Sequence, residues 1–117
     1  LLSRHADFYR AFSSHDLPAM EALWDNSRRV TCVHPGQEAI QGWEEVVEPW
    51  GEIFPGPKFD VMPQQVRPRI VGGVAYVTCI ETIGKVRRVV TNIVEESEGV
   101  WKLRLHTMAC PLVLGKA

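Results

Sequence analysis

Apolar residues in the first part of the chain recur at helical spacing. Between residues 2 and 12 they fall three or four positions apart, a pattern typical of an amphipathic helix. These residues are Leu2, Ala6, Tyr9 and Phe12. Asp16 then provides a side chain that commonly caps a helix N-terminus, and Pro18 falls within the first turn that follows. We therefore predict a second, shorter helix, which ends at residues 25–27.

An extended segment and a longer helix come next. Residues 29–34 are rich in β-branched side chains and predict a strand, which Pro35 and Gly36 end. Over residues 42–54 the helical period returns, with apolar side chains on one face and glutamates mostly on the other. Pro49 removes one backbone hydrogen bond from this helix and should bend it.

The second half of the chain consists of apolar, β-branched runs separated by glycine turns. The predicted strands are residues 58–62 and 65–71, as one long strand or two pieces, followed by residues 74–83, 86–95 and 100–110. Pro63 and Pro68 interrupt the first two runs, which suits an edge or bulged strand. This order of elements predicts one α+β domain, residues 1–117, with the helices on one side of a curved antiparallel sheet.

The turns set the register of this predicted sheet. A two-residue loop at residues 84–85 pairs Glu81 with Arg88 and Val77 with Asn92. At the next turn, a three-residue loop with a left-handed Gly99 puts Trp101, Leu103 and Leu105 on the same face as Tyr76, Ile80 and Ile93. A four-residue loop would reverse these three residues.

We prefer the shorter loop because it separates an apolar face from a mixed one. The polar residues of the mixed face include Glu81, Arg88, Asn92, Arg104 and His106. Valines also lie on this face, so it is too apolar to be left in water. We therefore predict that it lies on the outside of the sheet and forms a dimer surface.

Composition narrows the classes of partner. Of the 117 residues, 45% are hydrophobic and 23% charged, and the net charge is -1. This balance argues against a nucleic acid or an anionic membrane held by bulk charge. The chain also contains no run of about 18 apolar residues, so we expect no membrane span.

The three cysteines are Cys32, Cys79 and Cys110, an odd number without C-x-x-C spacing. We expect neither a disulfide framework nor a metal site, and no cofactor. Small core cysteines fit a soluble protein in a reducing compartment, such as the cytoplasm or an organelle stroma. Because the chain begins at Leu1, we expect a trimmed or mature form, so a removed targeting peptide would leave no trace.

Several motifs along nearly the whole chain resemble those of one family. They are Phe8-Tyr9, Asp16-Leu17 with Met20, Leu23-Trp24, Cys32-Val33-His34-Pro35-Gly36, Gly42-Trp43, Trp50, Ile53-Phe54, Cys79 with Glu81, Thr91-Asn92-Ile93, and Trp101-Lys102 with His106. Together they resemble the SnoaL-like domains of the nuclear transport factor 2-like superfamily. The resemblance implies a cone-shaped half-barrel with a pocket between sheet and helix, and a homodimer formed through the sheet.

The superfamily includes ketosteroid isomerase, in which an aspartate before a proline abstracts a proton. The corresponding residue here is His34, before Pro35. The tyrosine that stabilises the oxyanion in the isomerase falls on Phe8 rather than on Tyr9, and its second carboxylic acid falls near Asn92. The resemblance therefore implies at most a histidine base, without a recognisable oxyanion hole.

The candidate site combines that histidine with aromatic residues. His34 is the candidate catalytic base, because its unperturbed pKa lies near neutrality. The predicted pocket is lined by Tyr9, Trp24, His34, Trp43, Trp50, Tyr76 and Trp101. The alternative is a purely structural role, in which His34 only fixes the turn and the tryptophans only fill the core.

Three functions remain open from the sequence. The first is a homodimeric domain that binds a small apolar ligand. The second is cofactor-free proton transfer of the isomerase or cyclase type, with His34 as base. The third is a protein-association module, which an interior filled by Trp43 and Trp50 would favour.

Overall fold

Two helices open the computed structural model, which describes residues 1–111. Helix α1 (Leu2–Ser14) buries one face and ends where His15 adopts a left-handed conformation with φ 54°. Helix α2 (Leu17–Leu23) starts at Asp16, whose carboxylate accepts a hydrogen bond from the backbone N–H of Ala19 at 3.1 Å. The predicted N-cap is thus confirmed.

The next segment forms two short strands and a third helix. Strand β1 (Thr31–Val33) pairs with β2 (Ile40–Gln41), and α3 (Trp43–Ile53) follows directly. Gly42 begins this helix with a φ of 85°, a conformation that favours glycine. Pro49 lies inside the helix, as predicted.

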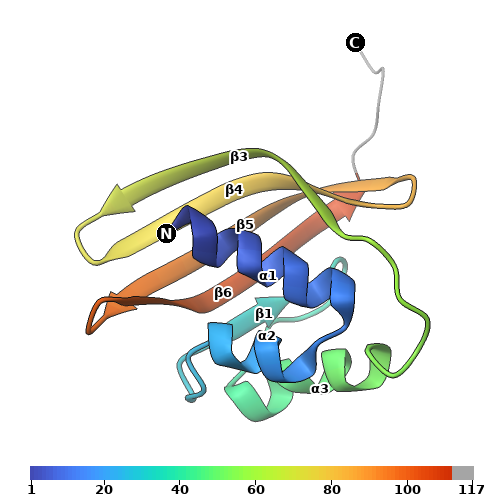
Figure 1. Ribbon diagram of the computed structural model, residues 1–117, viewed down its shortest axis with the longest axis horizontal. Helices are drawn as coiled ribbons and strands as arrows, with labels where there is room; N and C mark the ends of the chain where they lie inside the picture. The colour runs from blue at the N-terminus through green and yellow to red at the C-terminus, as the bar shows by residue number, and fades with distance from the viewer. Residues whose placement is uncertain (112–117) are drawn as a thin grey trace.

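Four long strands complete the chain and form most of the sheet. They are β3 (Met62–Val71), β4 (Val74–Ile83), β5 (Val86–Ser97) and β6 (Val100–Pro111). The strand order is β2-β1-β6-β5-β4-β3, and only antiparallel pairs join the four long strands. Because β1 runs parallel to β6, the sheet is mixed rather than wholly antiparallel. The helices lie against one face of this curved sheet (Figure 1), which confirms the predicted fold class.

The register of the central hairpin agrees with the prediction. Glu81 pairs with Arg88, and Val77 pairs with Asn92. The last turn is tighter than expected, because Ser97 pairs directly with Val100 around a two-residue loop. A register shift between Ile93 and Val94 then alters the alignment of β5 and β6.

The two faces of the sheet are exchanged relative to the prediction. Glu81, Asn92 and His106 are almost completely buried on the inner face, while Tyr76 is 44% exposed on the other face. The outward placement of this polar set is therefore wrong. Side chains of α1 supply partners for Glu81 and Asn92, and Asn92 in turn binds His106. Binary patterning could not reveal these contacts. The shift in β5 and β6 brings Leu103 to the inner face together with His106.

The other two residues of the predicted outer set are also partly buried within the chain. Arg88 is partly buried on the inner face, opposite Glu81. Arg104 forms ion pairs with Asp25, at 3.3 Å, and with Glu95. Neither residue is freely exposed for a partner subunit.

The core lies between the inner face of the sheet and the three helices. Its aromatic residues include Phe8, Phe12, Trp24, Trp50 and Phe54. Within residues 1–111, no helix combines the length and the apolar character needed to cross a membrane.

Candidate functional site

A cluster of polar side chains lies buried where α1 crosses the inner face of the sheet. Tyr9 Oη donates to Glu81 Oε2 at 2.9 Å, and Cys79 Sγ lies 3.4 Å from the same hydroxyl. Asn92 Nδ2 lies 3.4 Å from Tyr9 Oη and 3.0 Å from His5 Nε2. A single network therefore joins α1 to strands β4 and β5.

His106 extends this network to β6. Its Nδ1 atom hydrogen-bonds to Asn92 Oδ1 at 2.5 Å, and its Nε2 atom lies 4.0 Å from Glu81 Oε2. The imidazole is fully buried and rests against the rings of Phe8 and Trp50, whose centroids lie 5.0 and 6.3 Å away. We call Tyr9, Glu81, Asn92 and His106 the buried quartet.

Burial favours the uncharged forms of Glu81 and His106, and so shifts their pKa values in opposite directions. Loss of hydration raises the pKa of Glu81 to about 6, although the hydrogen bond from Tyr9 and the charge of Arg88 oppose this shift. Loss of hydration also lowers the pKa of His106 to about 3, and the charges of His34 and His5 add to the effect. Near neutral pH the site therefore contains a carboxylate beside a neutral imidazole.

Two atoms of the quartet have unsatisfied hydrogen-bonding capacity. Within the described part of the chain, Glu81 Oε1 and His106 Nε2 are buried without a hydrogen-bond partner. Both residues are at most 1% exposed. Buried polar atoms without partners are rare in folded proteins and call for a specific explanation.

Aromatic side chains fill the space beside the quartet. The indole of Trp50 packs against Phe8, Phe12 and Trp24, with ring centroids 5.5 to 6.1 Å apart. Trp50 is only 1% exposed. Trp50 therefore fills part of the core beside the quartet. Trp43 is only partly buried and packs against Trp24.

His34 lies near the quartet rather than within it. It follows β1, and its Nε2 atom is 3.7 Å from Cys32 Sγ. Cys32 is the strand partner of His106, which brings the His34 turn close to the quartet. Partial burial lowers the pKa of His34. Its role as a base stays a prediction.

The fold places the predicted pocket residues in the interior, at the edge of the core and on the outer face of the sheet. Tyr9, Trp24 and Trp50 lie in the interior, as their positions in the helices indicated. Trp101 lies at the edge of the core beside Arg4, which donates from Nε to the Trp101 carbonyl at 3.0 Å. Tyr76 is on the outer face, so its placement in the pocket is wrong.

Sequence reasoning missed the combined role of Glu81, Asn92 and His106. The sequence did contain one indication that these three residues cluster. All three were predicted to share a face, and the predicted alignment of their strands was almost correct. Polar residues in the middle of strands, on a face that also carries buried valines, indicate a polar cluster in a core as readily as a dimer surface. Only their distance from Tyr9 and His5 decides between the two.

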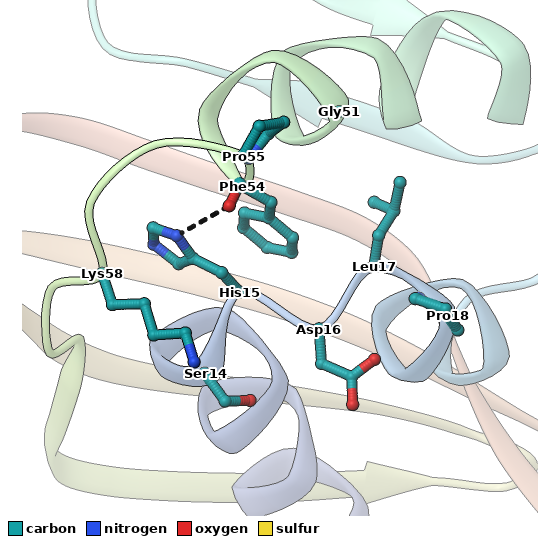
Figure 2. A pocket seen from close by; sticks show the side chains of 9 residues that line it. All are labelled: Ser14, His15, Asp16, Leu17, Pro18, Gly51, Phe54, Pro55 and Lys58. Atoms are coloured by element: carbon teal, nitrogen blue, oxygen red, sulfur yellow. Dashed lines mark hydrogen bonds between the residues drawn. The ribbon is translucent and has the colours of Figure 1, made fainter.

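A separate hollow lies outside the cone, where the end of α1 and the start of α2 meet the end of α3 (Figure 2). Its volume is about 650 Å³. In it, the His15 ring stacks on Phe54 at 4.8 Å, and His15 Nδ1 donates to the Phe54 carbonyl at 3.2 Å. This hydrogen bond and stacking hold the α1–α2 turn against α3, so a structural role accounts for His15.

The comparison with known families matches residues 2–112 to the SnoaL-like domain model. The chain belongs to the SnoaL-like domain family. The chain is 29% identical over 116 residues to the F-box protein SKIP8 of Arabidopsis thaliana, covering 97% of this chain and 50% of that protein. The SnoaL-like domain described here therefore spans half the length of that relative.

Solved structures share the same fold. A protein from Streptomyces avermitilis, provisionally assigned as a dehydratase of the NTF2-like family, aligns with a TM-score of 0.84 at 24% identity, covering 95% of this chain and 92% of that one. An NTF2-like protein from Cytophaga hutchinsonii aligns with a TM-score of 0.80 at 14% identity, covering 93% of each chain. These similarities establish the NTF2-like fold of this SnoaL-like domain.

Proposed function

We propose that residues 1–117 form a single SnoaL-like domain that binds a small, largely apolar molecule inside the cone. The proposal is carried by Glu81 Oε1 and His106 Nε2, which are buried among aromatic rings without partners in residues 1–111. An unmade hydrogen bond at such an atom costs about 1–3 kcal/mol. A ligand with an apolar body and one polar end would give at least one of these atoms a partner and replace the aromatic contacts.

Trp50 is the side chain that would have to move to admit this molecule. Its neighbour Pro49 has no N–H group, so the helix lacks one backbone hydrogen bond immediately before Trp50. Gly51 follows, and a Cβ atom added there would meet nothing within 4 Å. Proline on one side and glycine on the other make this turn of α3 the easiest to deform, which supports Trp50 as a gate.

The test is a titration with 1-indanol, which has a bicyclic apolar body and one hydroxyl. The indole N–H signals of the four tryptophans can be followed by NMR. We expect saturable shifts at Trp50 and Trp24, smaller shifts at Trp101, and tighter binding by Trp50→Ala because the gate is removed. Trp50→Leu serves if the alanine variant does not fold. The absence of saturable shifts in the wild type and in both variants would refute the ligand site.

We also propose that the domain forms a homodimer through the outer face of the sheet. The support is a group of exposed apolar side chains, each at least 40% exposed, on strands β3, β4 and β5. They are Val71, Val74, Tyr76 and Val89. A second copy of the same face would remove them from water, which would stabilise the dimer by about 25 cal/mol per Å² of buried apolar surface.

A protein-association module is the second candidate function. Of the two tryptophans whose packing into the interior would favour it, Trp50 is 1% exposed and Trp43 is only partly buried. One relative is an F-box protein, and a protein from Thiobacillus denitrificans, provisionally assigned as a calcium/calmodulin-dependent protein kinase type II association domain, shares the fold with a TM-score of 0.80. A stable dimer combined with no response to 1-indanol in any variant would favour this candidate.

A further inference from the structure

The direction of each hydrogen bond in the buried quartet can be worked out from the chemistry of its groups. Above its pKa of about 6, Glu81 is a carboxylate and can only accept. The Tyr9 hydroxyl, 2.9 Å away, must therefore donate its only proton to Glu81. The Tyr9 oxygen is left as an acceptor for its two other neighbours, Cys79 Sγ and Asn92.

This requirement fixes the orientation of the Asn92 amide. Its nitrogen donates to Tyr9 Oη at 3.4 Å and to His5 Nε2 at 3.0 Å, which uses both N–H groups. Its oxygen consequently faces His106 Nδ1. His106 must then carry its ring proton on Nδ1, and the opposite nitrogen, Nε2, has a bare lone pair.

Glu81 and His106 therefore present acceptors to each other. His106 Nε2 and Glu81 Oε2 are 4.0 Å apart, and Glu81 Oε1 is buried beside them without a partner within residues 1–111. An amino group lying between Glu81 and His106 can donate to both, and a hydroxyl, which has one proton, can donate to either, since hydrogen-bonded heavy atoms are about 2.9 Å apart. A carbonyl oxygen would instead place a further acceptor beside Glu81 Oε1 and His106 Nε2.

We propose that the molecule bound in the cone presents a hydrogen-bond donor, a hydroxyl or an amino group, to Glu81 and His106, and that the site rejects a ketone of the same shape. This inference rests on the proposed ligand function and specifies its substrate class. A site built to bind a donor discriminates strongly against an analogue that lacks it, because its own polar atoms are then left unpaired.

Four probes with one carbon skeleton test the inference: 1-indanol, 1-aminoindane, 1-indanone and indane. Dissociation constants are measured at pH 8 by the tryptophan NMR titration, with the wild type and with Trp50→Leu. We expect the alcohol and the amine to bind at least about tenfold more tightly than the ketone and the hydrocarbon, which corresponds to about 1.4 kcal/mol.

Glu81→Gln provides the matched variant, because glutamine keeps the shape but adds N–H donors. In this variant we expect the preference for the alcohol over the ketone to shrink or reverse. Lowering the pH of the wild type to 5 should act in the same direction, because a protonated Glu81 can donate to a carbonyl. The pH experiment provides the same comparison if Glu81→Gln does not fold.

The outcomes separate this inference from the proposed function. Equal or tighter binding of 1-indanone, with shifts at Trp50, would overturn the donor rule and leave the ligand site intact. A preference for the alcohol that is unchanged both by Glu81→Gln and at pH 5 would also overturn it, by removing Glu81 from recognition. If no probe binds to the wild type or to either Trp50 variant, both proposals fail.

Discussion

Tyr9 Oη donates to Glu81 Oε2 at 2.9 Å and so joins α1 to the middle of β4 in the interior of the protein. The two residues are 72 positions apart in the sequence. This contact gives one of the two oxygens of a carboxylate with only 1% exposure a hydrogen-bond partner. It also places the one strongly acidic group of the quartet within reach of His106.

Replacing Tyr9 by phenylalanine should weaken the fold by removing the donor to Glu81. We expect Tyr9→Phe to lower the free energy of unfolding by about 1–3 kcal/mol and to raise the pKa of Glu81 further. Urea denaturation at pH 7.5 measures the first effect. Tyr76→Phe is the control: it keeps the aromatic ring that the proposed dimer would cover and should change the stability by less than about 0.5 kcal/mol. Equal effects of the two substitutions would contradict the role of the Tyr9 hydroxyl.

Glu81 should make stability depend on pH. Its pKa is raised from 4.5 to about 6 in the fold, so its favourable contribution is present below pH 4.5 and is lost as the pH rises through 6. Relative to the wild type, Glu81→Gln should become more stable by roughly 2 kcal/mol between pH 4 and pH 7.5, because each pKa unit is worth about 1.36 kcal/mol. Parallel stability profiles of the two proteins would show that the pKa of Glu81 is not raised in the fold.

If the proposed dimer forms, a lysine should disrupt it at an exposed apolar residue on the outer sheet face but not at one on α1. Tyr76→Lys on the outer sheet face should convert a dimer into a monomer, because it places a charge in the apolar interface. Leu2→Lys on α1 should leave the dimer unchanged, although Leu2 is 54% exposed and Tyr76 only 44%. Sedimentation velocity measures both variants. A dimer that survives Tyr76→Lys would argue against this interface.

The Ser13 hydroxyl should stabilise the loop that precedes β3. Ser13 Oγ accepts from the Val61 N–H at 2.8 Å and lies 3.1 Å from the Val61 carbonyl, to which it donates. Because Val61 is 1% exposed, Ser13→Ala would leave its buried backbone groups unpaired. We expect a loss of about 1–3 kcal/mol in the free energy of unfolding, measured by urea denaturation.

The neighbouring Ser14→Ala provides the control for that prediction. Ser14 Oγ donates to the Arg10 carbonyl at 2.7 Å on an exposed part of the helix. Water can replace this hydrogen bond, so the change in stability should stay within about 0.5 kcal/mol. Equal losses for the two serine variants would show that the bonds to Val61 are not what stabilises the loop.

Local chemistry determined most of the fold from the sequence. Asp16 caps α2, Gly42 begins α3, and the turn at residues 84–85 sets the pairing of Glu81 with Arg88. Each of these features depends on a side chain or a turn within a few residues of it. The helical and extended periods depend likewise on short windows, so the sequence alone was sufficient to predict them.

Which face of the sheet lies inside was decided only by the tertiary structure. Both faces carry apolar side chains, and the polar residues Glu81, Asn92 and His106 made the true inner face look like the outer one. Tyr9 and His5 reach across from α1 and hydrogen-bond to Glu81 and Asn92, which lowers the free-energy cost of burying these two residues. Those contacts join residues more than 70 positions apart, and no local pattern along the chain records them.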